Sequence, residues 1–262
     1  QNIYDFNNFT INEGLSQSSA LCIVQDDNFA LWVGTQDGLN RFDGKSFEVF
    51  NTEDTKGFGG NFIRDLVKDE KGNLWIASGN GLIFRDKKLE KFTTFNPENV
   101  QFSIEDISIN TSKKEIWLAT TRHGIWVFDY AKREFKSMTN IFPSRKTQKV
   151  FVSQEEILFV ASEDRPLEAY NQKTGQLKSI SLKSKNGQEI NVNSFYQNKS
   201  GQVILCTNQG LYSCSTSTFN TQTIFPQLDS QFGISNVSGI LQADEKYWYI
   251  TTINKGLFTI FP

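Results

Sequence analysis

The sequence has very few of the side chains that most often carry chemistry. Its 262 residues include one histidine, three cysteines and one methionine. A site built from several histidines is therefore excluded, and a catalytic triad could use only His123. Cys206 and Cys214 lie on either side of Gly210 in two neighbouring predicted strands, so one disulfide bond and two buried thiols both remain open.

Further absences narrow the class of protein. No apolar run approaches the ~18 residues that a membrane-spanning helix needs, so we expect no membrane segment in this chain. A formal net charge of −2 argues against a nucleic-acid partner. Because the chain has neither a glycine-rich phosphate loop nor a metal-spaced cluster of Cys and His, we expect no cofactor and no metal. The first residue, Gln1, fits either an excised piece of a longer chain or a protein whose signal peptide has been removed.

What the sequence has in abundance is aromatic residues, arranged in a repeat. Its 23 Phe, 7 Tyr and 5 Trp favour half-buried β-structure. A large residue recurs six times, at intervals of 43, 42, 42, 45 and 44 residues, and most copies continue with a small residue and a hydroxyl. The recurring residues are Trp32, Trp75, Trp117, Phe159, Ile204 and Trp248. A short polar turn and a second apolar run follow, opening with glycine in five copies and with Pro166 in the fourth.

Repeats of this length indicate the four-stranded blades of a β-propeller. A sheet that is apolar on both faces must pack against its neighbours. We therefore predict an all-β fold, a single β-propeller domain over residues 1–262 with six blades of four antiparallel strands. The recurring Trp and Phe are interpreted as packing between blades rather than as platforms for sugars. The Asp and Asn residues that recur near one hairpin are interpreted as turn caps. They are Asp26, Asp69, Asn110, Asn198 and Asp244.

The two ends of the repeat array suggest how a ring would close. The sixth repeat reaches Pro262 after its third strand, and residues 4–9 form an extra strand-like segment before the first blade. We predict that residues 4–9 supply the outer strand of the last blade, which would remove an exposed sheet edge. The alternative is that the six repeats are part of a seven-bladed ring.

Three stretches of the chain, residues 12–16, 37–43 and 69–76, resemble the two-component regulator propeller repeat. The resemblance extends over nearly the whole chain, with departures at Phe159, Pro166 and Ile204. It implies the periplasmic sensor region of a hybrid two-component histidine kinase, placed before a β-sandwich domain, a membrane span and the kinase. It also implies an oligosaccharide ligand, neighbouring domains of the same protein as partners, and rings that commonly have seven blades. A homodimer stays open.

The blade topology also predicts where a ligand would bind. Turns between second and third strands and loops between blades emerge on one face around the central channel, where irregular residues are the natural recognition surface. The candidates are Phe58, Asn80, Phe102, Arg122, His123, Arg165, Asn208, Phe232 and Lys255. Aromatic faces beside Asn and Arg side chains suit a sugar or an acidic sugar.

Three functions stay open for such a surface. We favour a non-catalytic sensor module, because the carboxylates at repeat positions are already interpreted as turn caps and no catalytic residue is assigned. A second hypothesis is a lyase or glycosidase that uses carboxylates on the channel face. The third is a scaffold for protein assembly.

Overall fold

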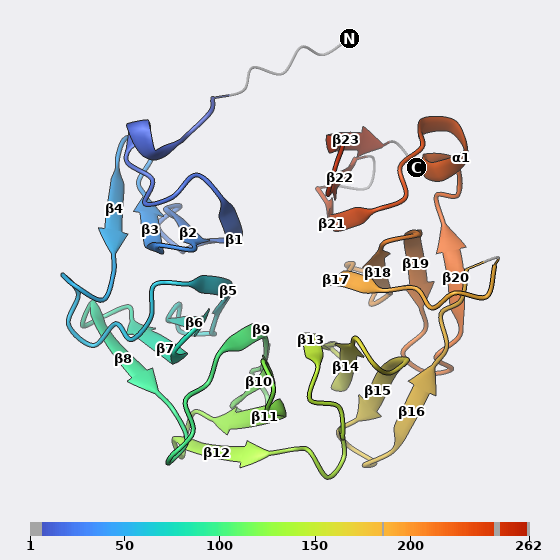
Figure 1. Cartoon of the computed structure of the whole chain (residues 1–262), viewed down its shortest axis with the longest axis horizontal. Helices are drawn as coiled ribbons and strands as arrows, with labels where there is room; N and C mark the ends of the chain where they lie inside the picture. Colours follow the sequence, from blue (N-terminus) through green and yellow to red (C-terminus); the bar gives the residue numbers. More distant parts are fainter. Residues whose placement is uncertain (1–6, 185, 244–246, 261–262) are drawn as a thin grey trace. The chain divides into compact units, whose positions relative to one another are not determined.

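The computed structural model describes residues 7–184, 186–243 and 247–260, and nearly all of its regular structure is antiparallel sheet (Figure 1). Six sheets, here called blades 1 to 6, lie in two compact units, Gln1–Met138 and Thr139–Pro262, with three blades in each. The only helices in the described ranges are η1 (Ile11–Glu13) and α1 (Gln227–Phe232). Neither of these short helices has the length or the apolar character that crossing a membrane requires.

The first unit holds three sheets whose strands pair in chain order. Blade 1 consists of β1 (Ala20–Gln25), β2 (Leu31–Thr35), β3 (Gly38–Phe42) and β4 (Phe47–Phe50). Blade 2 consists of β5 (Ile63–Lys68), β6 (Leu74–Ser78), β7 (Gly81–Asp86) and β8 (Lys91–Phe95). Blade 3 consists of β9 (Ile104–Asn110), β10 (Glu115–Thr120), β11 (Gly124–Asp129) and β12 (Glu134–Ser137).

The second unit repeats the same sheet order, with one strand fewer in its last described sheet. Blade 4 consists of β13 (Thr147–Val152), β14 (Ile157–Ser162), β15 (Leu167–Asn171) and β16 (Leu177–Ile180). Blade 5 consists of β17 (Val192–Gln197), β18 (Val203–Thr207), β19 (Gly210–Cys214) and β20 (Thr221–Ile224). Blade 6 consists of β21 (Val237–Gln242), β22 (Trp248–Thr252) and β23 (Gly256–Ile260).

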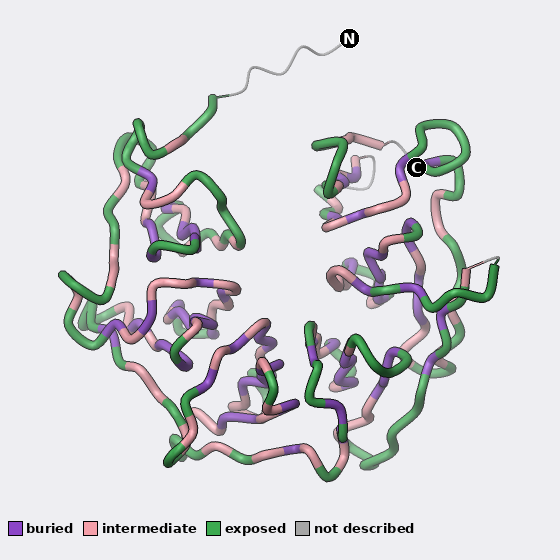
Figure 2. The backbone as a smooth tube through the Cα atoms, viewed as in Figure 1, coloured by how far each residue is buried: buried purple, intermediate pink, exposed green. Residues whose placement is uncertain are grey.

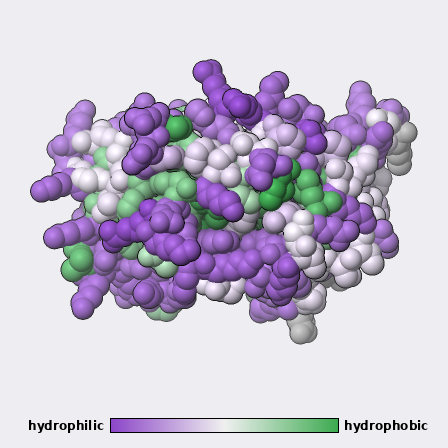
Figure 3. Space-filling view, turned by 90° about the horizontal axis from the view of Figure 1, so that it is seen from below, coloured by the Kyte–Doolittle hydropathy of each residue, from purple (hydrophilic) through white to green (hydrophobic). Residues whose placement is uncertain are grey.

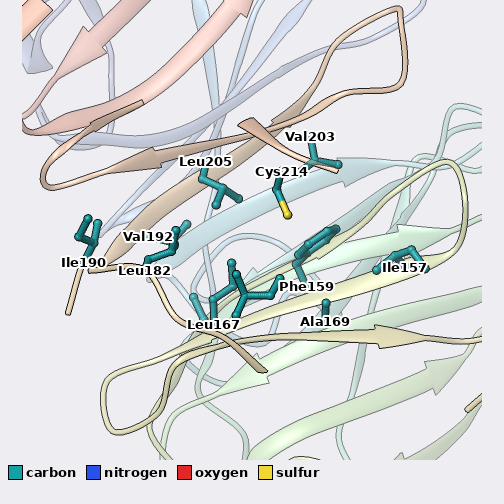
Figure 4. Packing of buried hydrophobic residues seen from close by; sticks show 12 residues of the cluster. Ile157, Phe159, Leu167, Ala169, Leu182, Ile190, Val192, Val203, Leu205 and Cys214 are labelled. Atoms are coloured by element: carbon teal, nitrogen blue, oxygen red, sulfur yellow. The ribbon is translucent and has the colours of Figure 1, made fainter. Parts of the chain in front are cut away.

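Neighbouring blades within a unit bury their apolar faces against each other. Phe159 and Leu167 of blade 4 pack in one cluster with Leu205 of blade 5 (Figure 4). Trp32 of blade 1 is fully buried and packs in one cluster with Ile76 of blade 2. Burial follows the strands, while turns and loops are mostly exposed (Figure 2). Since each fully buried large apolar side chain contributes roughly 1.5–3 kcal/mol, the recurring large residues stabilise the stack, as predicted.

The recurring hydroxyl closes the hairpin between the second and third strands. In five blades its oxygen donates a hydrogen bond of 2.7–3.1 Å to the carbonyl of the glycine that opens the third strand. The donors are Thr35, Ser78, Thr120, Thr207 and Thr252, and the acceptors are Gly38, Gly81, Gly124, Gly210 and Gly256. The repeat therefore encodes a local hydrogen bond as well as a packing pattern.

The recurring carboxylates and amides cap the turn before the second strand. Asp26 accepts hydrogen bonds from the backbone N–H groups of Asn28 and Ala30, and its second oxygen accepts one of 2.9 Å from the indole N–H of Trp32. These bonds help to hold the pKa of Asp26 below its ordinary value, against the effect of burial. The predicted capping role is confirmed here, whereas the predicted cap Asp244 lies outside the described residues.

Blade 6 differs by one residue from the alignment that the sequence predicts. Tyr249 lies opposite Leu241, just as Trp32 lies opposite Val24 in blade 1. The prediction that Trp248 holds the position of Trp32 is therefore wrong. Because Trp248 and Tyr249 are adjacent aromatic residues, the sequence fits two strand registers equally well, and only the strand pairing decides between them.

The predicted closing strand at residues 4–9 lies partly outside the described residues. Its described part, residues 7–9, is not a strand. The ring of Phe9 packs against Phe42 and Phe47 of blade 1, with centroid separations of 4.9 and 5.7 Å. This aromatic residue therefore belongs to the packing of blade 1.

The cysteines are free thiols. Cys206 lies opposite Leu211 and Cys214 opposite Val203, so the two sulfurs are not cross-strand partners. Burial raises the pKa of each thiol to about 11. Both therefore behave as small buried side chains, which decides the alternative left open by the sequence.

Candidate functional site

The hairpin of blade 4 is the one that departs from the repeat. It joins β14 to β15 through residues 163–166, and Pro166 stands where the other blades have glycine. In blade 1 the N–H of that glycine, Gly38, donates a 2.8 Å hydrogen bond to the carbonyl of Asn61 in the next loop between blades. Proline has no N–H to donate, so the blade 4 hairpin cannot be tied to its neighbouring loop in this way.

A cavity of about 220 Å³ opens at this departure. Its lining residues are Gln148, residues 161–167 and residues 189–192, which belong to blade 4, to the connection that follows it and to the start of blade 5. The hydroxyl of Ser162 takes the position that closes the hairpin in the other blades, but here it is buried and has no hydrogen-bond partner among the described residues. The local break in the repeat thus leaves a hollow with an unused hydroxyl at its edge.

Arg165 supplies a positive charge to the cavity. Its side chain is 40% exposed, and its Nε lies 3.4 Å from Oε1 of Glu168, which is only 1% exposed. Burial raises the pKa of Glu168, and the charge of Arg165 opposes that rise. The second carboxylate oxygen, Oε2, is buried without a hydrogen-bond partner in the described structure. Glu168 does not itself line the cavity.

The facing wall of the cavity is held in place by Asn208. The backbone N–H of Asn191 donates a 3.0 Å hydrogen bond to Oδ1 of Asn208, and the N–H of Asn208 donates one of 3.1 Å to the carbonyl of Asn191. Gln148 donates a 2.9 Å bond to Glu163 at the rim. The structure therefore brings two predicted residues to one site, Arg165 in the lining and Asn208 behind it.

Three predicted residues of the first unit meet at a different place. Gln101 donates a hydrogen bond to the amide oxygen of Asn80, and the ring of Phe102 lies 5.8 Å from that of His123. The side-chain amide of Asn80 also donates a 2.9 Å bond to the carbonyl of Gly59. Asn80 is thus engaged in fixing two loops, and Phe102 is completely buried.

Burial corrects the prediction for Phe58 and Phe102. Phe58 is 4% exposed and packs edge-on against Phe92, with centroids 5.2 Å apart. Neither ring has a face available for a ligand, because these segments between blades turn their aromatic residues into the core. Arg122 is exposed in a turn with a positive φ of 69°.

The last two predicted residues also lie together. Nζ of Lys255 donates a 3.2 Å hydrogen bond to the carbonyl of Phe232 at the end of α1. Phe232 is 57% exposed. Neither residue lines the cavity at blade 4.

The sequence prediction missed Gln148, Ser162, Glu168 and Asn191. One signal in the sequence points to this region, because Pro166 departs from the repeat. On the face seen in Figure 3 the surface is mostly hydrophilic, with hydrophobic areas between polar side chains.

Comparison with known proteins agrees with the repeat. Residues 57–80 match the family model described as two component regulator propeller. A segment of 52 residues, 19% of this chain, is 54% identical to histidine kinase P4 of Formosa agariphila and covers 4% of that protein.

Solved structures share the architecture. The extracellular domain of BT3049 from B. thetaiotaomicron, described as a hybrid two component system, has a TM-score of 0.79 at 22% identity, over 97% of this chain and 35% of that one. The extracellular domain of BT4673 from the same organism, described as a one component system, has a TM-score of 0.75 at 16% identity, over 97% and 37%. The chain thus spans little more than a third of these solved domains. Its six sheets have the β-propeller architecture, and residues 57–80 carry the two-component regulator propeller repeat, which confirms the β-propeller fold and the resemblance predicted from the sequence.

Proposed function

We propose that this chain is the ligand-recognition module of a two-component sensor and that it binds a saccharide in the cavity at the blade 4 hairpin. One observation carries the proposal. The hairpin that lacks the repeat's glycine has a cavity, a buried Ser162 hydroxyl without a partner and the partly exposed guanidinium of Arg165. The similarity to extracellular domains of bacterial regulatory systems supports the sensor role.

The chemistry of the cavity suits a ligand rich in hydroxyl groups. The Ser162 hydroxyl and the amide of Asn191 can exchange hydrogen bonds with sugar hydroxyls, and Arg165 can donate to a ring oxygen or a carboxylate. Leu167 and Ile190 supply apolar surface for the CH groups of a sugar ring. A cavity of about 220 Å³ is of a size for one sugar residue at the end of a chain.

We infer that the module binds its ligand without transforming it. Glu168 is the carboxyl nearest this site with a raised pKa, as a general acid would require. Its oxygens are directed to Arg165 or buried, outside the cavity lining. Detectable cleavage of a polysaccharide that is abolished in Glu168→Gln would overturn this inference and favour a glycosidase or lyase.

The proposal includes the setting of the module. We place it outside the cytoplasm, in the periplasm, because the similar solved structures are extracellular domains. Neighbouring domains of a longer sensor protein are its proposed partners, and they would receive the signal through altered packing on ligand binding. A homodimer of the sensor is compatible with this role.

The binding test uses a panel of neutral oligosaccharides and calorimetry, with melting temperature as a second readout. A ligand at 100 times its dissociation constant stabilises the folded state by ~2.7 kcal/mol, which is readily measured. Arg165→Gln should weaken binding by about tenfold to a hundredfold, since a hydrogen bond to a charged group contributes about 1.5–3 kcal/mol. Lys173→Gln, at an exposed position in the turn between β15 and β16 that lines neither this cavity nor another described here, is the control and should leave binding unchanged. If no saccharide binds and a protein partner is captured instead, the module is a scaffold.

A further inference from the structure

A second cavity, of about 140 Å³, lies in the first unit. Its walls are four aromatic rings from blades 2 and 3. The ring of Trp75 lies 4.5 Å from that of Phe84, 6.3 Å from that of Phe95 and 5.5 Å from that of Tyr130, measured between centroids. Trp75 is only 4% exposed, and the other three rings are half-buried.

This cavity lies at the other end of the strands from the predicted recognition loops. It is bordered by the turn between β5 and β6 and by the turn between β11 and β12. In an antiparallel sheet, consecutive hairpins alternate between the two ends of the strands. The hairpin between β6 and β7, which carries Asn80, is therefore at the opposite end of blade 2.

The acidic groups at this cavity are already engaged by donors of the protein itself. Oδ1 of Asp69 accepts hydrogen bonds from the backbone N–H groups of Lys71 and Asn73, each 2.9 Å long. Glu70 forms an ion pair with Lys114 and accepts a 3.2 Å hydrogen bond from the hydroxyl of Tyr130. The ion pair is the main cause that holds the pKa of Glu70 below its ordinary value. Both carboxylates thus have hydrogen-bond partners within the protein, and Glu70 also has a cationic partner.

Two basic side chains at the rim remain uncompensated. Lys71 and Arg133 line the cavity and are exposed, and neither forms an ion pair with any described residue. The guanidinium of Arg133 stands 5.9 Å from the ring centroid of Phe95. Aromatic walls are thus combined with free positive charge at the mouth.

We propose that this cavity binds one sugar ring that carries a carboxylate or sulfate group. The CH groups of the ring would pack on Phe84, Phe95 and Tyr130, and the anionic group would meet Arg133 and Lys71. A quaternary ammonium group would also fit aromatic walls, but the positive charge at the rim repels it. The site is separate from the cavity at blade 4 and would give the module a second contact with an acidic polysaccharide.

The test titrates the chain with methyl glucuronide and with glucose 6-sulfate, using uncharged methyl glucoside for comparison. Binding is followed by calorimetry and by the NMR resonance of the Trp75 indole N–H, identified with Trp75→Phe. We expect both anionic sugars to bind at least tenfold more tightly than methyl glucoside and to shift that resonance. The double variant Lys71→Gln/Arg133→Gln should weaken this binding at least tenfold. Lys132→Gln should have no effect, because Lys132 on the same turn is paired with Asp129 at 3.2 Å.

Several results would overturn the proposal. These are no binding by either anionic sugar up to about 10 mM, a range that already includes very weak sites, equal affinity for methyl glucoside, or unchanged affinity in the double variant. Binding that is lost in Arg165→Gln and kept in the double variant would reject this site while supporting the one at blade 4. Binding of the anionic sugars that is lost only in the double variant would support this site. The cavity at blade 4 would then be tested separately with the neutral oligosaccharides.

Discussion

Replacing Glu168 by glutamine should make the protein more stable at neutral pH. Glu168 is 1% exposed, and one of its carboxylate oxygens is buried without a partner. The equivalent residue in blade 1 is Asn40, whose buried amide donates to Ser16 and Val33. In blade 2 it is Ile83, which is fully buried. Among the six described blades, only blade 4 has an acidic residue at this position.

The expected size follows from these contacts. Leaving a buried polar group unsatisfied costs about 1–3 kcal/mol, and more when the group is charged. The ion pair with the partly exposed Arg165 offsets less than about 1 kcal/mol of this cost of burial. Glutamine still places a polar atom without a partner at the position of Oε2, so only the part of this cost that is due to the charge is removed. Glu168→Gln should therefore raise the free energy of unfolding by about 1 kcal/mol. For a chain of this size, each kcal/mol corresponds to about 2–4 °C in melting temperature.

The effect should depend on pH. Burial raises the pKa of Glu168 above its ordinary value of 4.5, so the folded state binds the proton more tightly than the unfolded state. Wild-type stability is therefore lost as pH rises from the unfolded pKa through the raised folded pKa. The advantage of Glu168→Gln should be small near pH 4, grow with pH and level off above the raised pKa.

Urea unfolding of both proteins between about pH 4 and pH 8 measures this difference. Glu134→Gln, at an exposed position in β12, is the control and should change stability little at any pH. A less stable Glu168→Gln at pH 7 would mean that the ion pair with Arg165 outweighs desolvation. A difference that does not vary with pH would show that the carboxyl is not titrating as described.

Three further predictions concern a hairpin hydroxyl, a hairpin glycine and an exposed ion pair. Thr207→Val removes a hydroxyl that closes a hairpin and should lower the free energy of unfolding in urea by about 1–2 kcal/mol. Ser162→Ala removes a hydroxyl without a partner and should be neutral or stabilising. Equal losses of stability would contradict these different roles of the two hydroxyl groups. Gly38→Ala should lower the free energy of unfolding by about 1–3 kcal/mol more than Gly44→Ala. Both glycines have a positive φ, but only at Gly38 would a Cβ lie 2.7 Å from a backbone oxygen. Equal losses of melting temperature in the two variants would refute this prediction. Lys68 and Lys87 lower the pKa of Asp27 to about 2. The stabilisation by Asp27 is therefore present above its unfolded pKa of 3.8 and is lost as pH falls toward 2. Asp27→Asn should destabilise the protein near pH 6 and have little effect near pH 2, as urea unfolding at both pH values would measure.

The fold could be predicted because its determinants are local and repeated. A large residue, a hydroxyl and a glycine at fixed spacing specify a hairpin and its buried face, and the hydroxyl of Thr35 bonds to Gly38 only three residues away. Asp26 and Trp32, six residues apart, form another bond of the same kind. Because such short-range contacts recur along the chain, the sequence alone predicts strands, turns and blade order without knowledge of distant contacts.

The site was only partly predictable, because it depends on contacts between distant segments. Phe58 and Phe102 occupy loops by sequence, yet the structure buries both in the packing between blades. The aromatic run around Trp248 offered two registers, and only the pairing with β21 selected one. Pro166 was visible as a departure in the sequence, but its consequence required the tertiary structure. That consequence is the loss of an N–H that could tie the hairpin to a neighbouring loop, with a cavity between them. The sequence by itself thus determined the repeating blade, since its hydrogen bonds are local, while the tertiary structure decided which irregular side chains line a cavity.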